Sequence, residues 1–246
     1  MEQIYTIPVN EAFEKVREPE HCTCPFCLMY NQLESNELDL ILGASMMEPD
    51  VRLKTNEQGF CDTHLGQMFN HGKRLPLALI LESHLDSLAS DLDGNMGLFL
   101  QKTADNAAKR LDKLGGSCYI CERIEYNFSR MLETAALLWQ SDSAFHDKVA
   151  AAPYFCLPHY GRFIRAARER LSKKDFAEFY KQVDGIEKAY LTKLRGDVSW
   201  FCKKFDYRYE NEPWGDAKDA PERARVFLGG ALHEETDDEK PTDSLT

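Results

Sequence analysis

The chain has 246 residues, of which 43% are hydrophobic, and this is enough to bury a core without help from disulfides or metal ions. Its formal net charge of −11 argues against binding to nucleic acid or anionic lipid, because phosphate neutralisation needs clustered Lys and Arg. The longest apolar run, Leu75–Leu81, is too short to cross a membrane, and the first residues lack a secretory signal pattern, so a cytoplasmic location is expected.

The first notable segment of the chain carries two linked motifs. Cys24 and Cys27 form a C-x2-C motif, and Cys61 and His64 form an F-C-x2-H motif after a spacer of 33 residues. The apolar positions within the spacer favour a helix that ends near Gly43. These positions are Tyr30, Leu33, Leu38 and Ile41.

The same two motifs occur again about 94 residues later. Cys118 and Cys121 are followed, after 34 residues, by Cys156 and His159. Phe60 and Phe155, which precede the second cysteine motif of each copy, also correspond. We interpret this agreement as an internal duplication, with repeat 1 at about 20–75 and repeat 2 at about 114–172.

Three thiolates and one imidazole suit a tetrahedral zinc ion, and ligands three residues apart share one face of a helix's first turn. The sequence therefore predicts two zinc ions, each bound by the four ligands of one copy and each joining two helix starts. Iron–sulfur clusters and metal-free thiols are the alternatives, because spacing alone does not separate them from zinc. The predicted quartets are Cys24, Cys27, Cys61 and His64, and Cys118, Cys121, Cys156 and His159.

Two further cysteines have no place in the duplicated pattern. Cys22 corresponds to Gly116 of the second copy, so the repeat indicates that Cys22 is not a ligand. A redox role as a spare thiol stays open for it. Cys202 falls on the apolar side of an expected helix, where a small buried hydrophobic role is favoured.

Helical periodicity continues along the rest of the chain, and strand signals are almost lacking. The pattern predicts an all-α helical bundle that forms a single domain over 1–230, with the two copies related by a pseudo-two-fold axis. An acidic tail at 231–246 is expected to be disordered. The expected helices after the first repeat's motifs are about 77–92, 97–114, 124–138, 160–171, 173–207 and 221–228.

The duplicated motifs and a later segment, Glu212–Ala220, together resemble those of an uncharacterised bacterial family, a domain of unknown function. The resemblance covers roughly Ile4 to Gly230. It implies a helical protein with paired C-x2-C and C-x2-H sites and no assigned activity. Some members carry an automatic label as transporter substrate-binding proteins, but this sequence lacks the export signal and α/β pattern that such a role requires.

Zinc sites with four protein ligands are usually structural, so the leading hypothesis is a zinc protein that binds a protein partner or a small ligand. A thiol–zinc redox sensor, with Cys22 as the resolving thiol, is one alternative. A metal-dependent enzyme is the other, and Glu82 and Asp86 on the linking helix are its candidate acids. Nucleotide-binding, zincin and hydrolase motifs are absent from the sequence.

Overall fold

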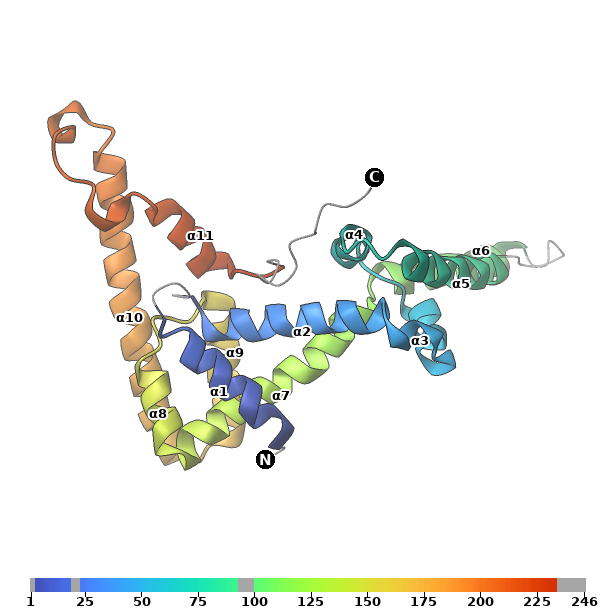
Figure 1. The fold of residues 1–246 in the computed structure, drawn as a ribbon, viewed down its shortest axis with the longest axis horizontal. Helices are drawn as coiled ribbons and strands as arrows, with labels where there is room; N and C mark the ends of the chain where they lie inside the picture. The colour runs from blue at the N-terminus through green and yellow to red at the C-terminus, as the bar shows by residue number, and fades with distance from the viewer. Residues whose placement is uncertain (1–2, 19–22, 93–99, 234–246) are drawn as a thin grey trace. The chain divides into compact units, whose positions relative to one another are not determined.

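The computed structural model describes residues 3–18, 23–92 and 100–233 (Figure 1). These residues form α-helices and short 3-10 turns, and no strand occurs among them, so the predicted all-α class is confirmed. The α-helices are α1 (Thr6–Lys15), α2 (Pro25–Ile41), α3 (Pro49–Gln58), α4 (Asp62–Asn70), α5 (Arg74–Leu92), α6 (Leu100–Gly115), α7 (Tyr119–Ser141), α8 (Ser143–Ala150), α9 (Leu157–Arg170), α10 (Lys173–Lys203) and α11 (Ala220–Gly229).

The chain divides into two compact units that do not coincide with the two sequence copies. The first unit consists of Met1–Asn31 and Phe128–Glu234, and the second contains Gln32–Asn127. Helices α2 and α7 each begin in one unit and end in the other. The single domain at 1–230, the internal duplication and the pseudo-two-fold axis stay predictions.

An aromatic core holds the first unit together. Phe26 on α2 is fully buried, and its ring centre lies 4.7 Å from that of Phe163, 5.5 Å from Phe13 and 5.7 Å from Phe155. Edge-on and tilted contacts of this kind stabilise more than the buried area alone. Because these rings come from α1, α2, α9 and the segment before α9, the cluster fixes the start of α2 beside the start of α9.

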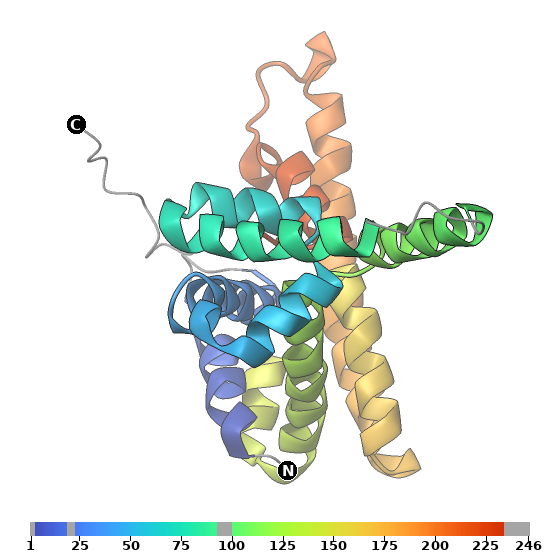
Figure 2. The same ribbon diagram turned by 90° about the vertical axis from the view of Figure 1, so that its right-hand side faces the viewer.

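The second unit is held together by polar contacts as well as apolar packing. Helices α3 and α5 pack on each other, and both face the viewer in Figure 2. The guanidinium of Arg52 on α3 donates to the main-chain oxygens of Met46 and Leu79, both at 2.6 Å. Arg110 on α6 donates in the same way to Asn56 and Glu57 at the end of α3. Both arginines therefore bind α3 to its neighbours.

The long C-terminal helix ends earlier than the sequence pattern predicts. We expected it to reach residue 207, but α10 ends at Lys203. The ammonium of Lys204 donates to the main-chain oxygens of Tyr209, Glu210 and Glu212 at 2.6–2.9 Å, and these bonds favour a turn over a further helical turn. Trp214 then packs on Phe201, with the two ring centres 5.6 Å apart.

Several predictions concern residues outside the described part of the chain. These are the spare role of Cys22 and the disorder of most of the acidic tail. None of the described helices is both long enough and apolar enough to span a membrane.

Candidate metal centres

The first candidate centre consists of Cys24, Cys27, Cys156 and His159, and all four belong to the first unit. Cys24 and Cys27 lie just before and within the first turn of α2, and Cys156 and His159 hold the same positions on α9. The His159 Nδ1 atom lies 3.9, 3.5 and 3.2 Å from the sulfurs of Cys24, Cys27 and Cys156. Each of the four side chains is at most 3% exposed.

The second candidate centre consists of Cys61, His64, Cys118 and Cys121, all within the second unit. Cys61 and His64 begin α4, and Cys118 and Cys121 begin α7. The His64 Nδ1 atom lies 3.2, 3.4 and 3.3 Å from the sulfurs of Cys61, Cys118 and Cys121.

Two main-chain segments are bound together beside the second centre. The amide of Tyr119 donates to the Gly59 oxygen at 3.0 Å, and the Ser117 hydroxyl donates to the Gln58 oxygen at 2.7 Å. Gly59 has a φ of +63°, which an L side chain rarely adopts, and this turn brings the chain from α3 to the cysteine motif. Hydrogen bonds next to the ligands thus join the segment before α4 to the segment before α7.

Both groups have the dimensions of a tetrahedral zinc site. With Zn–S and Zn–N bonds of about 2.3 and 2.0 Å, tetrahedral geometry places two sulfurs about 3.8 Å apart and a sulfur and nitrogen about 3.5 Å apart. The observed sulfur pairs, Cys27–Cys156 and Cys61–Cys121, are separated by 3.6 and 3.9 Å. The donor atoms of each group lie within 4.8 Å of one another, so either group could hold one metal ion.

The pairing of motifs that we predicted from the sequence is wrong. We expected Cys24 and Cys27 to share an ion with Cys61 and His64, but they meet the F-C-x2-H motif of the other copy. The C-x2-C motif of the second copy likewise meets Cys61 and His64. The expectation that each group joins two helix starts agrees with the structure, although the helices come from different copies.

Helix length explains the crossed pairing. The 17 residues of α2 run for about 26 Å, so they lead the chain away from the Cys24–Cys27 end before the next motif arrives. The 23 residues of α7 run for about 35 Å from the Cys118–Cys121 end. Each F-C-x2-H motif therefore follows a helix that has left its own C-x2-C motif behind.

Glu34 contacts a histidine of the second centre and was not among the residues predicted from the sequence. Its carboxylate is buried at 2% exposure and lies 3.1 Å from the Nε2 atom of His64, the ring nitrogen opposite the sulfurs. Gln67 donates to its other oxygen at 2.9 Å. Such a pair orients a metal-binding imidazole and fixes its tautomer. The signal was an acid four residues from both Tyr30 and Leu38, within the expected apolar stripe.

The protonation of the ligands shows how a cation would change each group. Burial raises the pKa of Cys24 well above its ordinary value of 9.0, and contact with Cys156 raises the pKa of Cys27 to about 12. Burial opposes protonation of His64, but contact with Cys118 and with its carboxylate partner outweighs this and raises its pKa to about 10. A bound metal must displace these protons, so acid competes with it.

The chain matches one known protein family over most of its length. A model of the family of unknown function DUF6062 matches residues 1–235. The chain belongs to this family. No curated protein and no solved structure matches it.

A C-terminal segment of this DUF6062 protein, Gly230–His233, lies against the first centre. Gly230 has a φ of +84°, and a Cβ there would lie 3.6 and 3.7 Å from the sulfurs of Cys156 and Cys27. The Ala231 amide donates to the Cys27 sulfur at 3.4 Å. The side chain of Asn31 donates to the Ala231 oxygen at 2.8 Å and accepts from the His233 amide at 3.1 Å. Asn31 therefore holds the segment over the ligands.

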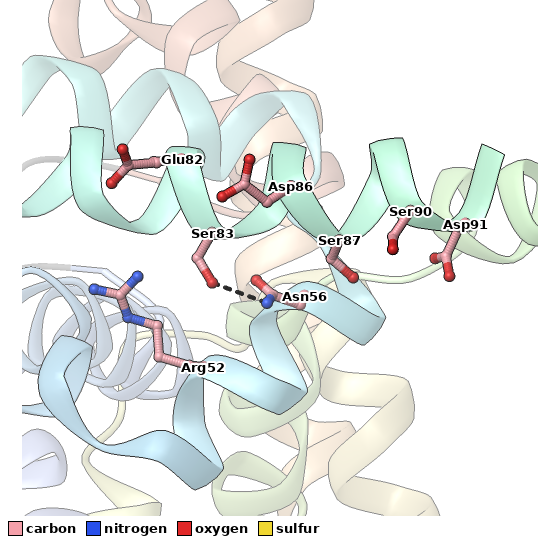
Figure 3. Close-up of a pocket in the computed structure, with 8 residues that line it drawn as sticks. All are labelled: Arg52, Asn56, Glu82, Ser83, Asp86, Ser87, Ser90 and Asp91. Carbon is pink, nitrogen blue, oxygen red and sulfur yellow. Dashed lines mark hydrogen bonds between the residues drawn. The ribbon is translucent and has the colours of Figure 1, made fainter. Parts of the chain in front are cut away.

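A polar hollow of about 620 Å³ lies between α3 and α5 (Figure 3). The candidate acids Glu82 and Asp86 are on its rim, and both are exposed. Asn56 donates to the Ser83 hydroxyl across the hollow at 2.9 Å. Arg52, its one cationic lining residue, already binds two main-chain oxygens. Arg52 thus serves the packing of α3 on α5, and the acidic side chains of the hollow do not converge on one point (Figure 3).

Cys202, which we expected to be buried, is exposed on α10. The helical pattern placed it beside Phe201, whose ring packs on Phe205 and Trp214. Cys202 faces solvent instead, because the directions of successive side chains around a helix differ by about 100°.

Proposed function

We propose that this protein binds two zinc ions, one in each centre, and that both ions have a structural role. The observation that carries the proposal is that three sulfurs and one imidazole nitrogen lie within 4.8 Å of one another in each group, which suits tetrahedral coordination of one zinc ion. Four protein ligands leave no position for a water or substrate, which catalytic zinc sites keep open.

The size of each group favours a single ion over an iron–sulfur cluster. All donor atoms of a group lie within 4.8 Å of one another. A cluster of two or four irons needs its protein ligands farther apart, because the iron and sulfide atoms lie between them. A neutral imidazole with three thiolates is also a donor set that zinc accepts readily.

We further propose that the protein acts in the cytoplasm as a binding or interaction protein. A reducing compartment keeps thiols free to bind metal, and six of the eight cysteines occupy the two centres. The acidic net charge of −11 favours a protein partner or a small ligand over nucleic acid or an anionic membrane.

Metal analysis of the purified protein tests the zinc proposal. We expect about two zinc ions per chain by plasma emission spectrometry, and no visible absorption from iron–sulfur chromophores. Removal of zinc by a chelator should lower the thermal midpoint, because binding to the folded state alone stabilises it. A content clearly below one ion per chain, with all thiols reduced, would contradict the proposal.

A further inference from the structure

The two centres differ in how far solvent reaches their ligands. In the first centre, Cys24, Cys27 and Cys156 are at most 1% exposed. In the second centre, Cys121 is exposed and Cys61 is partly exposed, whereas His64 and Cys118 remain buried. Ligand substitution at zinc needs an incoming donor to approach the ion. The accessibility of the ligands should therefore decide which ion can leave.

Access to the first centre is restricted by the segment Gly230–His233. The main chain passes 3.4 Å from the Cys27 sulfur, where the Ala231 amide donates a hydrogen bond to it. This hydrogen bond withdraws electron density from the Cys27 sulfur, so the sulfur becomes a poorer nucleophile. Because Asn31 binds this segment at both Ala231 and His233, an incoming ligand must first break these contacts. The first ion should exchange only when the segment opens.

The second centre combines two anchored ligands with one accessible ligand. His64 is held by the buried carboxylate of Glu34, and Cys118 is buried at 7% exposure. Cys121, in contrast, is an exposed residue of the first turn of α7, although its sulfur lies 3.3 Å from the Nδ1 atom of His64. The geometry lets Cys121 leave the ion while the buried ligands still hold it.

We propose that the second centre exchanges its zinc ion with a thiolate-bearing acceptor, and that the first centre retains its ion. In the first step the acceptor thiolate forms a bond to zinc as the zinc–Cys121 bond breaks, and the released Cys121 thiolate takes a proton from water. No electron is transferred. The inference rests on the proposed function, because it requires that both centres bind zinc, and it adds exchange to the structural role of the second ion.

Zinc release from the intact, fully loaded protein tests the proposal. A chromophoric chelator, pyridylazoresorcinol, should remove one of two ions at least about tenfold faster than the other, since the slow ion waits for a local opening. The same experiment with a dithiol acceptor should give the same two phases. Release of both ions at one rate would overturn the inference, whereas a starting content below two ions would overturn the proposed function instead.

Cysteine labelling then shows which centre released the fast ion. N-ethylmaleimide added during the fast phase should modify Cys121 and Cys61 and leave Cys24, Cys27 and Cys156 unmodified, as read by peptide mass spectrometry. Cys202 is an exposed cysteine outside both centres and serves as the internal control, because its labelling should not depend on zinc release. Early labelling of the first centre's cysteines would overturn the assignment.

An Asn31→Ala variant tests the role of the covering segment. Loss of its two hydrogen bonds should accelerate the slow phase several-fold and leave the fast phase unchanged. Gln32→Ala, at the next and exposed position of α2, is the matched control and should change neither phase. An unchanged slow phase in a folded Asn31→Ala protein would overturn the covering role. If that variant does not fold, the labelling order in the wild type still decides the proposal.

Discussion

The contact of His64 with one buried carboxylate is expected to affect the metal affinity of the second centre. Glu34 lies 3.1 Å from Nε2 and so favours the tautomer in which Nδ1, the atom facing the sulfurs, is free to bind metal. We expect Glu34→Gln to weaken zinc binding at the second centre by roughly 10–100-fold, the usual effect of removing such a partner. Competition with a fluorescent zinc chelator measures this affinity.

The control for that variant lies three residues farther along α2. Glu37 is buried at 6% exposure, but its carboxylate accepts a hydrogen bond from Arg123 at 2.5 Å instead of contacting a histidine. Glu37→Gln should leave zinc affinity at the second centre within about twofold of the wild type. Equal losses in both variants would show that negative charge on α2, and not the contact with His64, is what matters.

A second buried carboxylate makes the stability depend on pH. Glu187 on α10 accepts a hydrogen bond from the Phe155 amide at 3.2 Å, but its other oxygen has no partner. Burial raises its pKa from 4.5 to about 7. The folded state therefore binds more protons than the unfolded state between these values, so this residue makes the protein less stable as pH rises from about 4.5 through 7.

We expect Glu187→Gln to remove this loss, since a glutamine carries no charge and keeps an acceptor for the Phe155 amide. Between about pH 6 and pH 8.5, the variant should gain on the order of 1 kcal/mol of unfolding free energy relative to the wild type. Urea unfolding of both zinc-loaded proteins at each pH gives the difference. A difference that stays constant with pH would exclude Glu187 as the titrating group.

At the scale of elements, α8 depends on a single cap. The carboxylate of Asp142 accepts hydrogen bonds from the amides of Ala144 and Phe145 at 2.9 and 3.3 Å. An eight-residue helix is too short to be stable alone, so its cap and its packing decide whether it forms. Asp142→Ala should cost about 1 kcal/mol of unfolding free energy. Asp147→Ala, on the same helix with an 88% exposed side chain, should cost little; similar losses would rule out the cap.

Apolar periodicity predicted the long helices and the short helix α11, but it missed the short helices α1, α3 and α8. The stripes on α5, α7, α9 and α10 repeat over several turns, which makes them visible in the sequence. Helix α3 has only Val51 and Leu53 as large apolar residues, and it is fixed by the contacts of Arg52 and Arg110. Such a helix depends on tertiary partners, which a local pattern does not contain.

At the scale of the whole molecule, motif spacing found the residues of both groups but not their pairing. Spacing reports which side chains can share one turn of chain, and it placed Cys24 with Cys27 and Cys61 with His64 correctly. Which pairs meet depends on the direction in which α2 and α7 lead the chain. With two copies of one pattern, each C-x2-C motif can pair with the F-C-x2-H motif of its own copy or with that of the other copy. The ligand types are the same in both arrangements, so the packing of the helices determines which one forms.

Paired cysteine substitutions distinguish the within-copy arrangement from the crossed arrangement experimentally. In the crossed arrangement, Cys24 and Cys156 belong to one centre, so the variant with both changed to Ser should keep about one zinc per chain. Changing Cys24 and Cys61 to Ser damages both centres, and this variant should keep almost none. A within-copy arrangement predicts the reverse for the two variants. Both variants contain Cys24→Ser and a second substitution. The zinc content of the folded protein therefore reports the pairing and not the number of thiols removed.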